Sequence, residues 1–394
     1  MGLGGYLVGA LVFAGTWGAS AATAALLVRR QLPRLGGVPR VLAFAVLFLA
    51  ALIAAHLVPG VLGLLSRWSA LAVALIGLAA ATRFVPRAPG APNDDTPPAA
   101  RDSGPVSWAL AALAVAALSV YLVAQAWIVS RTPVVGTDAL SFELPVIGGW
   151  IRSGSLWGIH QFVPLQAQAD YPHNGNVVYL AAMQPFRSDF LVRLVSIPFV
   201  GLAGLSVYAI GRELRAPRAT AALAGVLFAA LPAVASTSYY GGKADTITLA
   251  AFGTGSLFAL RHVRLGRRAD LIVAGIGLGL ALGAKWYGVP ATLVVVGAWA
   301  VASLVQRRGV GVVVRGVLAL AGLMAAAGGF WFARNAVGSG SPAFPVAVPL
   351  FGSTPHDFVR DCVGFSIAHY AGKPGVLKDY AWPGWKLALG LGGG

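Results

Sequence analysis

Apolar runs alternate with short polar connections along the whole chain, and each run of about 20 residues is long enough to cross a bilayer as an α-helix. Ten spans are predicted, at about 3–28, 41–65, 68–84, 107–129, 188–211, 217–236, 244–262, 269–284, 287–305 and 311–332, and an eleventh begins near Trp385. The pattern predicts an all-α polytopic membrane protein. It excludes a soluble enzyme with a single anchor.

Basic residues predict the orientation of these spans. The chain has 29 Lys and Arg against 13 Asp and Glu, a formal net charge of +16, which in a soluble protein would suggest nucleic-acid binding. Here most of them lie in short connections, which favours a topology signal and no nucleic-acid partner. Seventeen fall on one set of alternating connections: Arg29, Arg30, Arg34, Arg40, Arg83, Arg87, Arg101, Arg212, Arg215, Arg218, Arg261, Arg264, Arg267, Arg268, Arg307, Arg308 and Arg315. The positive-inside rule places this set in the cytoplasm and the amino terminus outside.

The two longest connections, about 130–187 and 333–384, then both lie on the extracytoplasmic side. The first contains TDALSFELPVIGGWIRSGSL (137–156), which carries Asp138 and Glu143. Its second half predicts a short amphipathic helix lying in the membrane interface. The apolar positions of that helix are Leu144, Ile147, Trp150 and Ile151.

Four charged residues mark span ends on the predicted outer face. Asp138 and Asp245 lie where a loop meets a span, and an incompletely solvated carboxylate there indicates a function. Snorkelling would explain Lys285, and anchoring in the interface would explain Arg334. Two acids and two bases on one face nevertheless favour a common site. The other glutamate of the chain, Glu213, lies in a basic turn, where pairing with Arg212 or Arg215 is expected.

Several short motifs occur in a fixed order. They are Asp138 followed by ALSFELP, WI and SGSL, then YPHNGNVVYL (171–180), KAD (243–245), LGAKWYG (282–288) and WFARNAVGSGSPAFP (331–345). Over about residues 107–385 this order resembles the GT-C type polytopic glycosyltransferases. Within this type it resembles bacterial proteins akin to the dolichyl-phosphate-mannose protein mannosyltransferases of glycosyltransferase family 39.

The resemblance implies a catalytic acid at Asp138 and substrate-binding residues within the later motifs, including Tyr171 and His173. Family members often have a Tyr–His pair where this chain has Phe142–Glu143, so a divalent cation is left open. Asp138 also follows the fourth span, whereas the family acid follows the first core helix. The expected organisation is therefore a three-helix addition (1–84), a Pro- and Asp-rich cytoplasmic linker (85–106) and a catalytic module (107–394). That module is expected to be truncated, because it stops as another span begins.

The implied reaction moves a sugar from a polyprenyl phosphate to an acceptor hydroxyl. Asp138 is the candidate base. A phosphate leaves as a stable anion and needs only cationic stabilisation, for which Lys285 and Arg334 are the candidates. Direct displacement would invert the anomeric centre. The acceptor is a lipid, a glycan or a protein, and the expected location is the plasma membrane, with membrane lipids around an extracytoplasmic site.

Two further acids have open roles. Glu143 could orient Asp138, bind the acceptor or ligate a divalent cation. An α-helix would place these two acids, five residues apart, about one and a half turns apart, so helical geometry alone does not join them. Asp245 is either a ligand for a substrate hydroxyl or a partner of Lys243.

Three other functions are weighed against the glycosyltransferase. A secondary transporter predicts ionisable residues near mid-membrane, where the candidates are His56 and Arg193. A ligase or polymerase of surface polysaccharides would have the same broad shape. A membrane scaffold would leave the charged span ends unexplained.

The orientation predicts which segments face the outside. Single cysteines placed at 131–136 or 336–341, in a Cys362→Ala background, should react with an impermeant thiol reagent in intact cells. Labelling that requires lysis would reverse the orientation.

Overall fold

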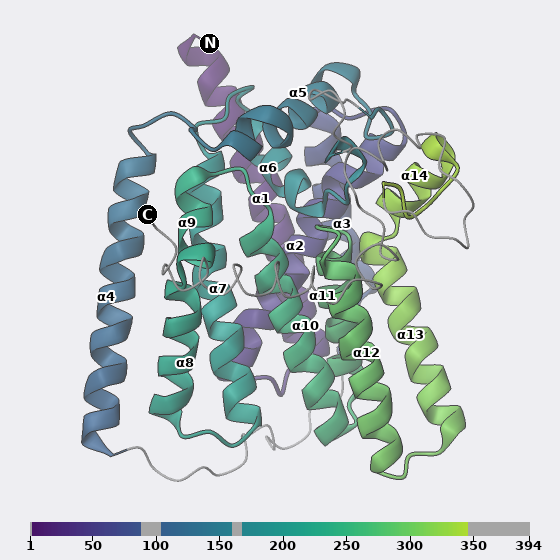
Figure 1. Ribbon diagram of the computed structural model, residues 1–394. Helices are drawn as coiled ribbons and strands as arrows, with labels where there is room; N and C mark the ends of the chain where they lie inside the picture. Colours follow the sequence, from purple (N-terminus) through teal and green to yellow (C-terminus); the bar gives the residue numbers. More distant parts are fainter. Residues whose placement is uncertain (1, 88–103, 160–167, 346–394) are drawn as a thin grey trace, which may run out of the picture.

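The protein is a bundle of α-helices in this computed structural model, which describes residues 2–87, 104–159 and 168–345 (Figure 1). Within these residues there is no β-strand, so the predicted all-α polytopic membrane fold is confirmed. Seven described helices are long and apolar enough to cross a membrane: α1 (Leu3–Gln31), α2 (Gly37–Val61), α3 (Arg67–Phe84), α4 (Pro105–Val129), α7 (Val192–Glu213), α12 (Gly288–Val305) and α13 (Val310–Gly328).

The remaining elements are shorter or less apolar. They are a π-helical turn η1 (Ala139–Glu143), α5 (Leu144–Ser153), a 3₁₀ turn η2 (Gln168–Asp170), α6 (Asn174–Met183), α8 (Arg218–Ala230), α9 (Pro232–Tyr240), α10 (Asp245–Leu265), α11 (Arg268–Leu282) and α14 (Phe330–Ser339). Most of the predicted linker, His160, Cys362 and the predicted span near Trp385 lie outside the described residues. The boundaries of the three-helix addition stay a prediction.

The predicted span 217–236 is wrong as a single helix. It divides into α8 and α9 at Leu231, whose φ of −53° and ψ of 131° are extended. Pro232 has no amide hydrogen, and its ring disfavours the helical conformation of the residue before it. Beyond the break, the short α9 lies toward the end of the bundle that carries α5 and α14 (Figure 1).

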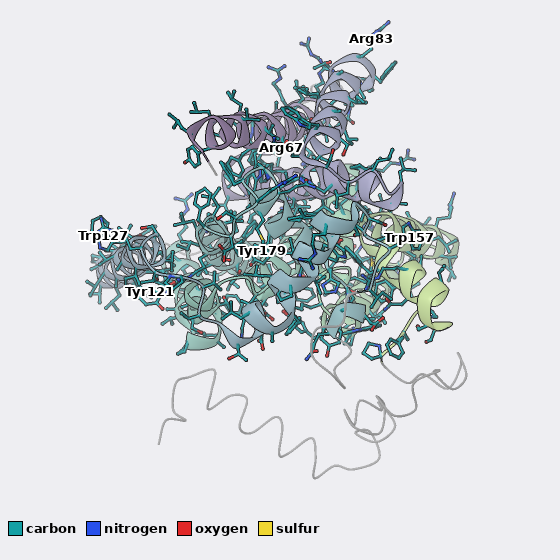
Figure 2. The ribbon with its side chains drawn as sticks, turned by 90° about the horizontal axis from the view of Figure 1, so that it is seen from above. Arg67, Arg83, Tyr121, Trp127, Trp157 and Tyr179 are labelled. Carbon is teal, nitrogen blue, oxygen red and sulfur yellow. The ribbon has the colours of Figure 1, made fainter. Side chains whose placement is uncertain are left out.

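A short buried helix, α6, forms the centre of that end of the bundle. Residues 174–182 are all buried, and α6 packs against α2, α5, α7 and α10. Figure 2, seen from above, shows Tyr179 of α6 near the middle and Trp127 of α4 at one edge. The predicted amphipathic helix is α5. Its apolar residues Leu144, Ile147 and Trp150 are buried, and α5 packs against α6.

Glycines allow neighbouring helices to approach closely. A Cβ atom on Gly277 of α11 would lie 2.9 Å from the Cα and N atoms of Gly255 of α10 and 3.0 Å from the carbonyl oxygen of Ala251. Only a residue without a side chain fits at such a backbone-to-backbone contact. This packing joins α10, which begins at the end of the bundle that carries α5 and α14, to α11, which ends there.

The basic connections lie at the opposite end of the bundle, where α7 meets α8, α10 meets α11 and α12 meets α13 (Figure 1). Glu213 is buried there, but its predicted pairing with Arg212 or Arg215 is wrong. Its carboxylate binds Arg261 at 2.8 Å and Arg264 at 2.7 Å. Both arginines lie in α10, 48 and 51 residues further along the chain, so their pairing with Glu213 cannot be seen from residues that are near it in sequence.

Close packing predicts a stability difference between two glycines. Gly277→Ala should lower the free energy of unfolding by about 1–3 kcal/mol, because the atoms that the new methyl group meets belong to the backbone. The measurement is thermal unfolding of the purified protein in detergent. Gly297→Ala in α12 is the matched control, since its Cβ would meet nothing within 4 Å. Equal midpoints for both variants would contradict the packing argument.

Candidate active site

A cavity of about 1010 Å³ opens at the end of the bundle opposite the basic connections. Its wall is built by η1, the turn after η2, α9, the start of α10 and the connection between α11 and α12. The lining residues are Asp138, Phe142, Gln168, Tyr171, Pro232, Ala233, Ser236, Thr237, Lys243, Asp245, Lys285, Trp286, Tyr287 and Pro345. Three of the four charged span ends predicted from sequence therefore share one cavity.

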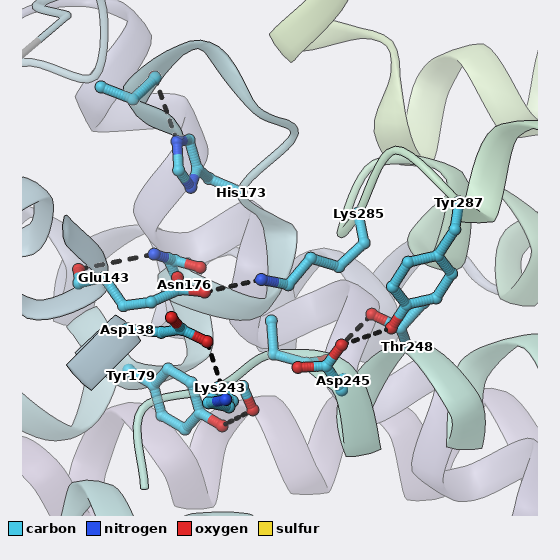
Figure 3. Close-up of polar contacts among 12 residues, drawn as sticks. Asp138, Glu143, His173, Asn176, Tyr179, Lys243, Asp245, Thr248, Lys285 and Tyr287 are labelled. Carbon is cyan, nitrogen blue, oxygen red and sulfur yellow. Dashed lines mark hydrogen bonds and ion pairs between the residues drawn. The ribbon is translucent and has the colours of Figure 1, made fainter. Parts of the chain in front are cut away.

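The π-helical turn η1 places both acids of the first loop. Asp138 precedes it and Glu143 ends it, and the amide of Leu144 donates to the carbonyl of Ala139, five residues earlier. In such a turn residues five apart stand about one turn apart. The expected separation of one and a half turns, which assumed an α-helix, is therefore wrong. Figure 3 shows both carboxylates directed at lysines from other elements.

Asp138 forms an accessible ion pair with Lys243. The Oδ2–Nζ distance is 2.7 Å, and the side chains are 47% and 29% exposed, respectively. The hydroxyl of Tyr179 donates to the carbonyl of Lys243 at 2.6 Å, and that hydroxyl also lies 2.9 Å from the Ser196 hydroxyl. The backbone of Lys243 is thus tied to buried α6 while its ammonium stays in the cavity.

Glu143 forms a second, buried ion pair with Lys285. The Oε1–Nζ distance is 2.6 Å, and the side chains are 1% and 14% exposed, respectively. Burial raises the pKa of Glu143, although the ammonium of Lys285 opposes the shift. Burial alone would lower the pKa of Lys285, but the nearby carboxylates of Glu143, Asp245 and Asp138 more than offset it and raise that pKa. Lys285 is therefore a permanent cation in the cavity wall.

The buried pair is also a structural link. Removing one partner of such a pair leaves an uncompensated charge and costs about 3–5 kcal/mol. Asn176 of α6 contacts the same acid, since its amide donates to the backbone carbonyl of Glu143 at 3.5 Å. The link holds η1 and the connection between α11 and α12 in one arrangement.

Asp245 accepts a hydrogen bond from Tyr287, whose hydroxyl lies 2.8 Å from Oδ1. Burial and the negative charge of Asp245 raise the pKa of Tyr287, so its phenol stays protonated and donates. Tyr287 was not among the site residues predicted from sequence. Its only signal was its place in LGAKWYG, two residues after Lys285.

Tyr171 and His173, from one motif, have different surroundings. Tyr171 lines the cavity, and burial raises the pKa of its phenol. His173 is buried against the stacked rings of Trp150 and Trp331, with ring centroids 5.4 and 5.5 Å away. Burial lowers the pKa of His173 well below its usual range, so the ring is neutral. His173 is not among the described residues that line the cavity.

Arg334 of α14 also lies behind the cavity wall rather than among its described lining residues. Its guanidinium is buried and donates to the carbonyls of Ala169 at 2.7 Å and Tyr171 at 3.5 Å. Burial lowers the pKa of Arg334 to about 10, so it remains charged at neutral pH. These contacts hold the turn that presents Tyr171.

The sequence alone does not decide whether the site holds a divalent cation. Within residues 2–87, 104–159 and 168–345 there is no group of three or more His, Cys, Asp or Glu that could hold a metal ion. The first oxygen of Glu143 is occupied by Lys285. The described wall thus offers ammonium groups, hydroxyls and carboxylates.

Part of the chain resembles a known protein family. The family model described as dolichyl-phosphate-mannose-protein mannosyltransferase matches residues 159–339, which is less than half of the chain. The matched part contains Tyr171, Lys243, Asp245, Lys285 and Arg334, while Asp138 and Glu143 precede it. Among curated proteins and among solved structures, no match was found.

This match agrees with the motif order and with the helical architecture. It indicates a membrane mannosyltransferase that uses a polyprenyl-phosphate sugar donor. The resemblance inferred from the sequence is therefore confirmed, and the chain is a multi-pass membrane glycosyltransferase similar to family 39, with an all-α fold of the GT-C type.

Proposed function

We propose that this enzyme transfers a hexose such as mannose from a polyprenyl phosphate to an acceptor hydroxyl, with inversion and with Asp138 as the general base. One observation carries the proposal. A single cavity brings the accessible carboxylate of Asp138 together with the ammonium groups of Lys243 and Lys285, which come from two other connections. A base beside fixed cations is what transfer away from a phosphate requires.

The reaction assigns one role to each charge. Asp138 accepts the proton of the acceptor hydroxyl as its oxygen attacks the anomeric carbon. The bond between that carbon and the phosphate oxygen breaks, and its electron pair stays on the phosphate. Lys285 stabilises the departing phosphate as a compact point charge. No second carboxyl group is needed as an acid, because phosphate is a good leaving group.

The remaining predicted residues support this arrangement. Glu143 holds Lys285 in place, and the Asp245–Tyr287 pair faces the same cavity as a ligand for sugar hydroxyls. Arg334 was expected to bind phosphate. Its hydrogen bonds to Ala169 and Tyr171 support instead a role in positioning the Tyr171 turn.

We place the cavity on the extracytoplasmic face of the plasma membrane. The support is that basic connections gather at the other end of the bundle, as the positive-inside rule requires of a cytoplasmic end. A lipid-carried donor suits that face, where no nucleotide sugars are available. Hydroxyl and apolar residues of α9, such as Ser236 and Pro232, form the wall on which a lipid, glycan or protein acceptor would lie.

The transporter alternative depends on two ionisable residues, and both have hydrogen-bond partners close by in the structure. The Nδ1 atom of His56 lies 2.9 Å from the carbonyl oxygen of Leu52, one turn earlier in α2. Arg193 donates to the carbonyls of Thr132 and Pro133, which ties α7 to the loop before η1. Neither residue lines the described cavity.

Asp138→Asn tests the general base. The substitution keeps the shape of the side chain and removes its proton acceptor, so transfer should fall by about a hundredfold or more with unchanged expression. The measurement is the turnover of purified protein with a polyprenyl-phosphate mannose donor. Asp189→Asn is the control, an exposed acid at the same end of the bundle that does not line the cavity. Near-normal turnover of Asp138→Asn would show that another group is the base.

The buried pair requires a paired experiment on Lys285. Lys285→Met alone would strand Glu143, so the informative variant is Glu143→Gln combined with Lys285→Met, which removes both charges. Turnover of this double variant should fall by about two to three orders of magnitude, the scale of one lost preorganised contact. Glu143→Gln alone should lose less turnover than the double variant, because the ammonium remains although it no longer has its carboxylate partner, and Lys285→Arg should keep only part of the activity. Full activity in the double variant would show that Lys285 has no role in the transfer.

A further inference from the structure

We propose that Lys243 exchanges partners during the reaction. In the donor-free enzyme its ammonium pairs with Asp138, and once the donor is bound it pairs with the phosphate, which leaves Asp138 free to accept a proton. This inference rests on the proposed function. It adds a second phosphate ligand and makes the availability of the base depend on the donor.

The two ion pairs of the cavity differ in how easily they can open. The Glu143 side chain is 1% exposed, so opening its pair would strand a charge away from water. Asp138 and Lys243 are 47% and 29% exposed, and exposed pairs contribute little to stability because water and salt screen them. Their contact can be replaced by another contact of similar strength. Lys285 is thus the fixed cation and Lys243 the exchangeable one.

The backbone at Lys243 contacts both α6 and η1, so the exchange requires movement of the side chain alone. Tyr179 holds the carbonyl of Lys243, and Gly241 and Gly242 precede it with φ of 70° and 69°. A Cβ atom on Gly242 would lie 3.0 Å from the Cβ of Ala139 in η1, so the loop packs directly on the turn that carries Asp138. The flexible four-carbon stem of the lysine can move its ammonium within the cavity while this loop stays in place.

The changes in charge during the reaction favour the proposed exchange of partners. When Asp138 takes the proton of the acceptor hydroxyl, its carboxylate becomes neutral. When the bond to the anomeric carbon breaks, the phosphate gains one negative charge. The best partner for Lys243 therefore changes from Asp138 to the phosphate. Glu143 takes no proton in this scheme, so Lys285 keeps its partner throughout.

The exchange predicts an unusual effect of removing the acid. With full-length purified protein in detergent, Asp138→Asn should bind farnesyl phosphate about two- to fivefold more tightly than the natural sequence, because Lys243 no longer has to leave a carboxylate. Lys243→Met should bind it more weakly. In the double variant Asp138→Asn with Lys243→Met, the gain from Asp138→Asn should disappear.

The double variant separates exchange from plain charge repulsion. If Asp138 only repelled the phosphate, its removal would strengthen binding equally with or without Lys243, and that outcome would overturn the proposal. So would the absence of any gain. Asp245→Asn is the matched control, because it removes another carboxylate of the wall that is bonded to Tyr287. Its effect on binding should be the same in the presence and absence of Lys243.

Two further outcomes keep the result interpretable. Failure of the natural sequence to bind farnesyl phosphate would count against the proposed function itself, and with it the inference. If Lys243→Met does not fold, as judged by size-exclusion chromatography, Lys243→Gln replaces it, since glutamine keeps a polar tip for the cavity.

Discussion

The contact between the ammonium of Lys285 and the carboxylate of Glu143 joins segments 142 positions apart, where the acid has almost no access to water. Each charge is tolerated because the other is present. The first loop and the connection between α11 and α12 therefore meet in one arrangement. The accessible pair of Asp138 and Lys243 lies beside this fixed one, and the close packing of α10 on α11 brings their connections to the same end.

Much of the fold followed from the spacing of apolar residues. Each of the ten predicted spans is mostly helical, because runs of about 20 apolar residues have few other solutions in a bilayer, but only seven are described helices long and apolar enough to cross a membrane and one divides into α8 and α9. The break at Pro232 was missed because hydropathy continues through it, although the proline itself is a signal. The buried helix α6 was not predicted because ten residues cannot span a membrane, and its burial depends on neighbours that come from distant parts of the chain.

The sequence predicted several residues of the candidate site but not how they contact one another. Charges at loop–span junctions identified Asp138, Asp245 and Lys285, because such positions are costly without a function. Their partners were not predictable, since ion pairs such as Lys243 with Asp138 depend on helix packing. Arg334 and His173 have the chemistry of ligands, yet they lie behind the wall, where they bind backbone carbonyls. Only the three-dimensional arrangement separates a residue in a cavity from one that supports it.

The π-helical turn also affects how related chains should be compared. A π-helical turn contains about one residue more than an α-helical turn. It therefore lengthens the segment by one residue with little change in the direction of the chain. Two acids that are four residues apart on an α-helix project from the same face. Asp138 and Glu143 do so here although they are five residues apart. Residue spacing in this loop is therefore a poor guide to equivalence, and a relative that lacks one residue there could still direct both carboxylates at the two lysines of the site.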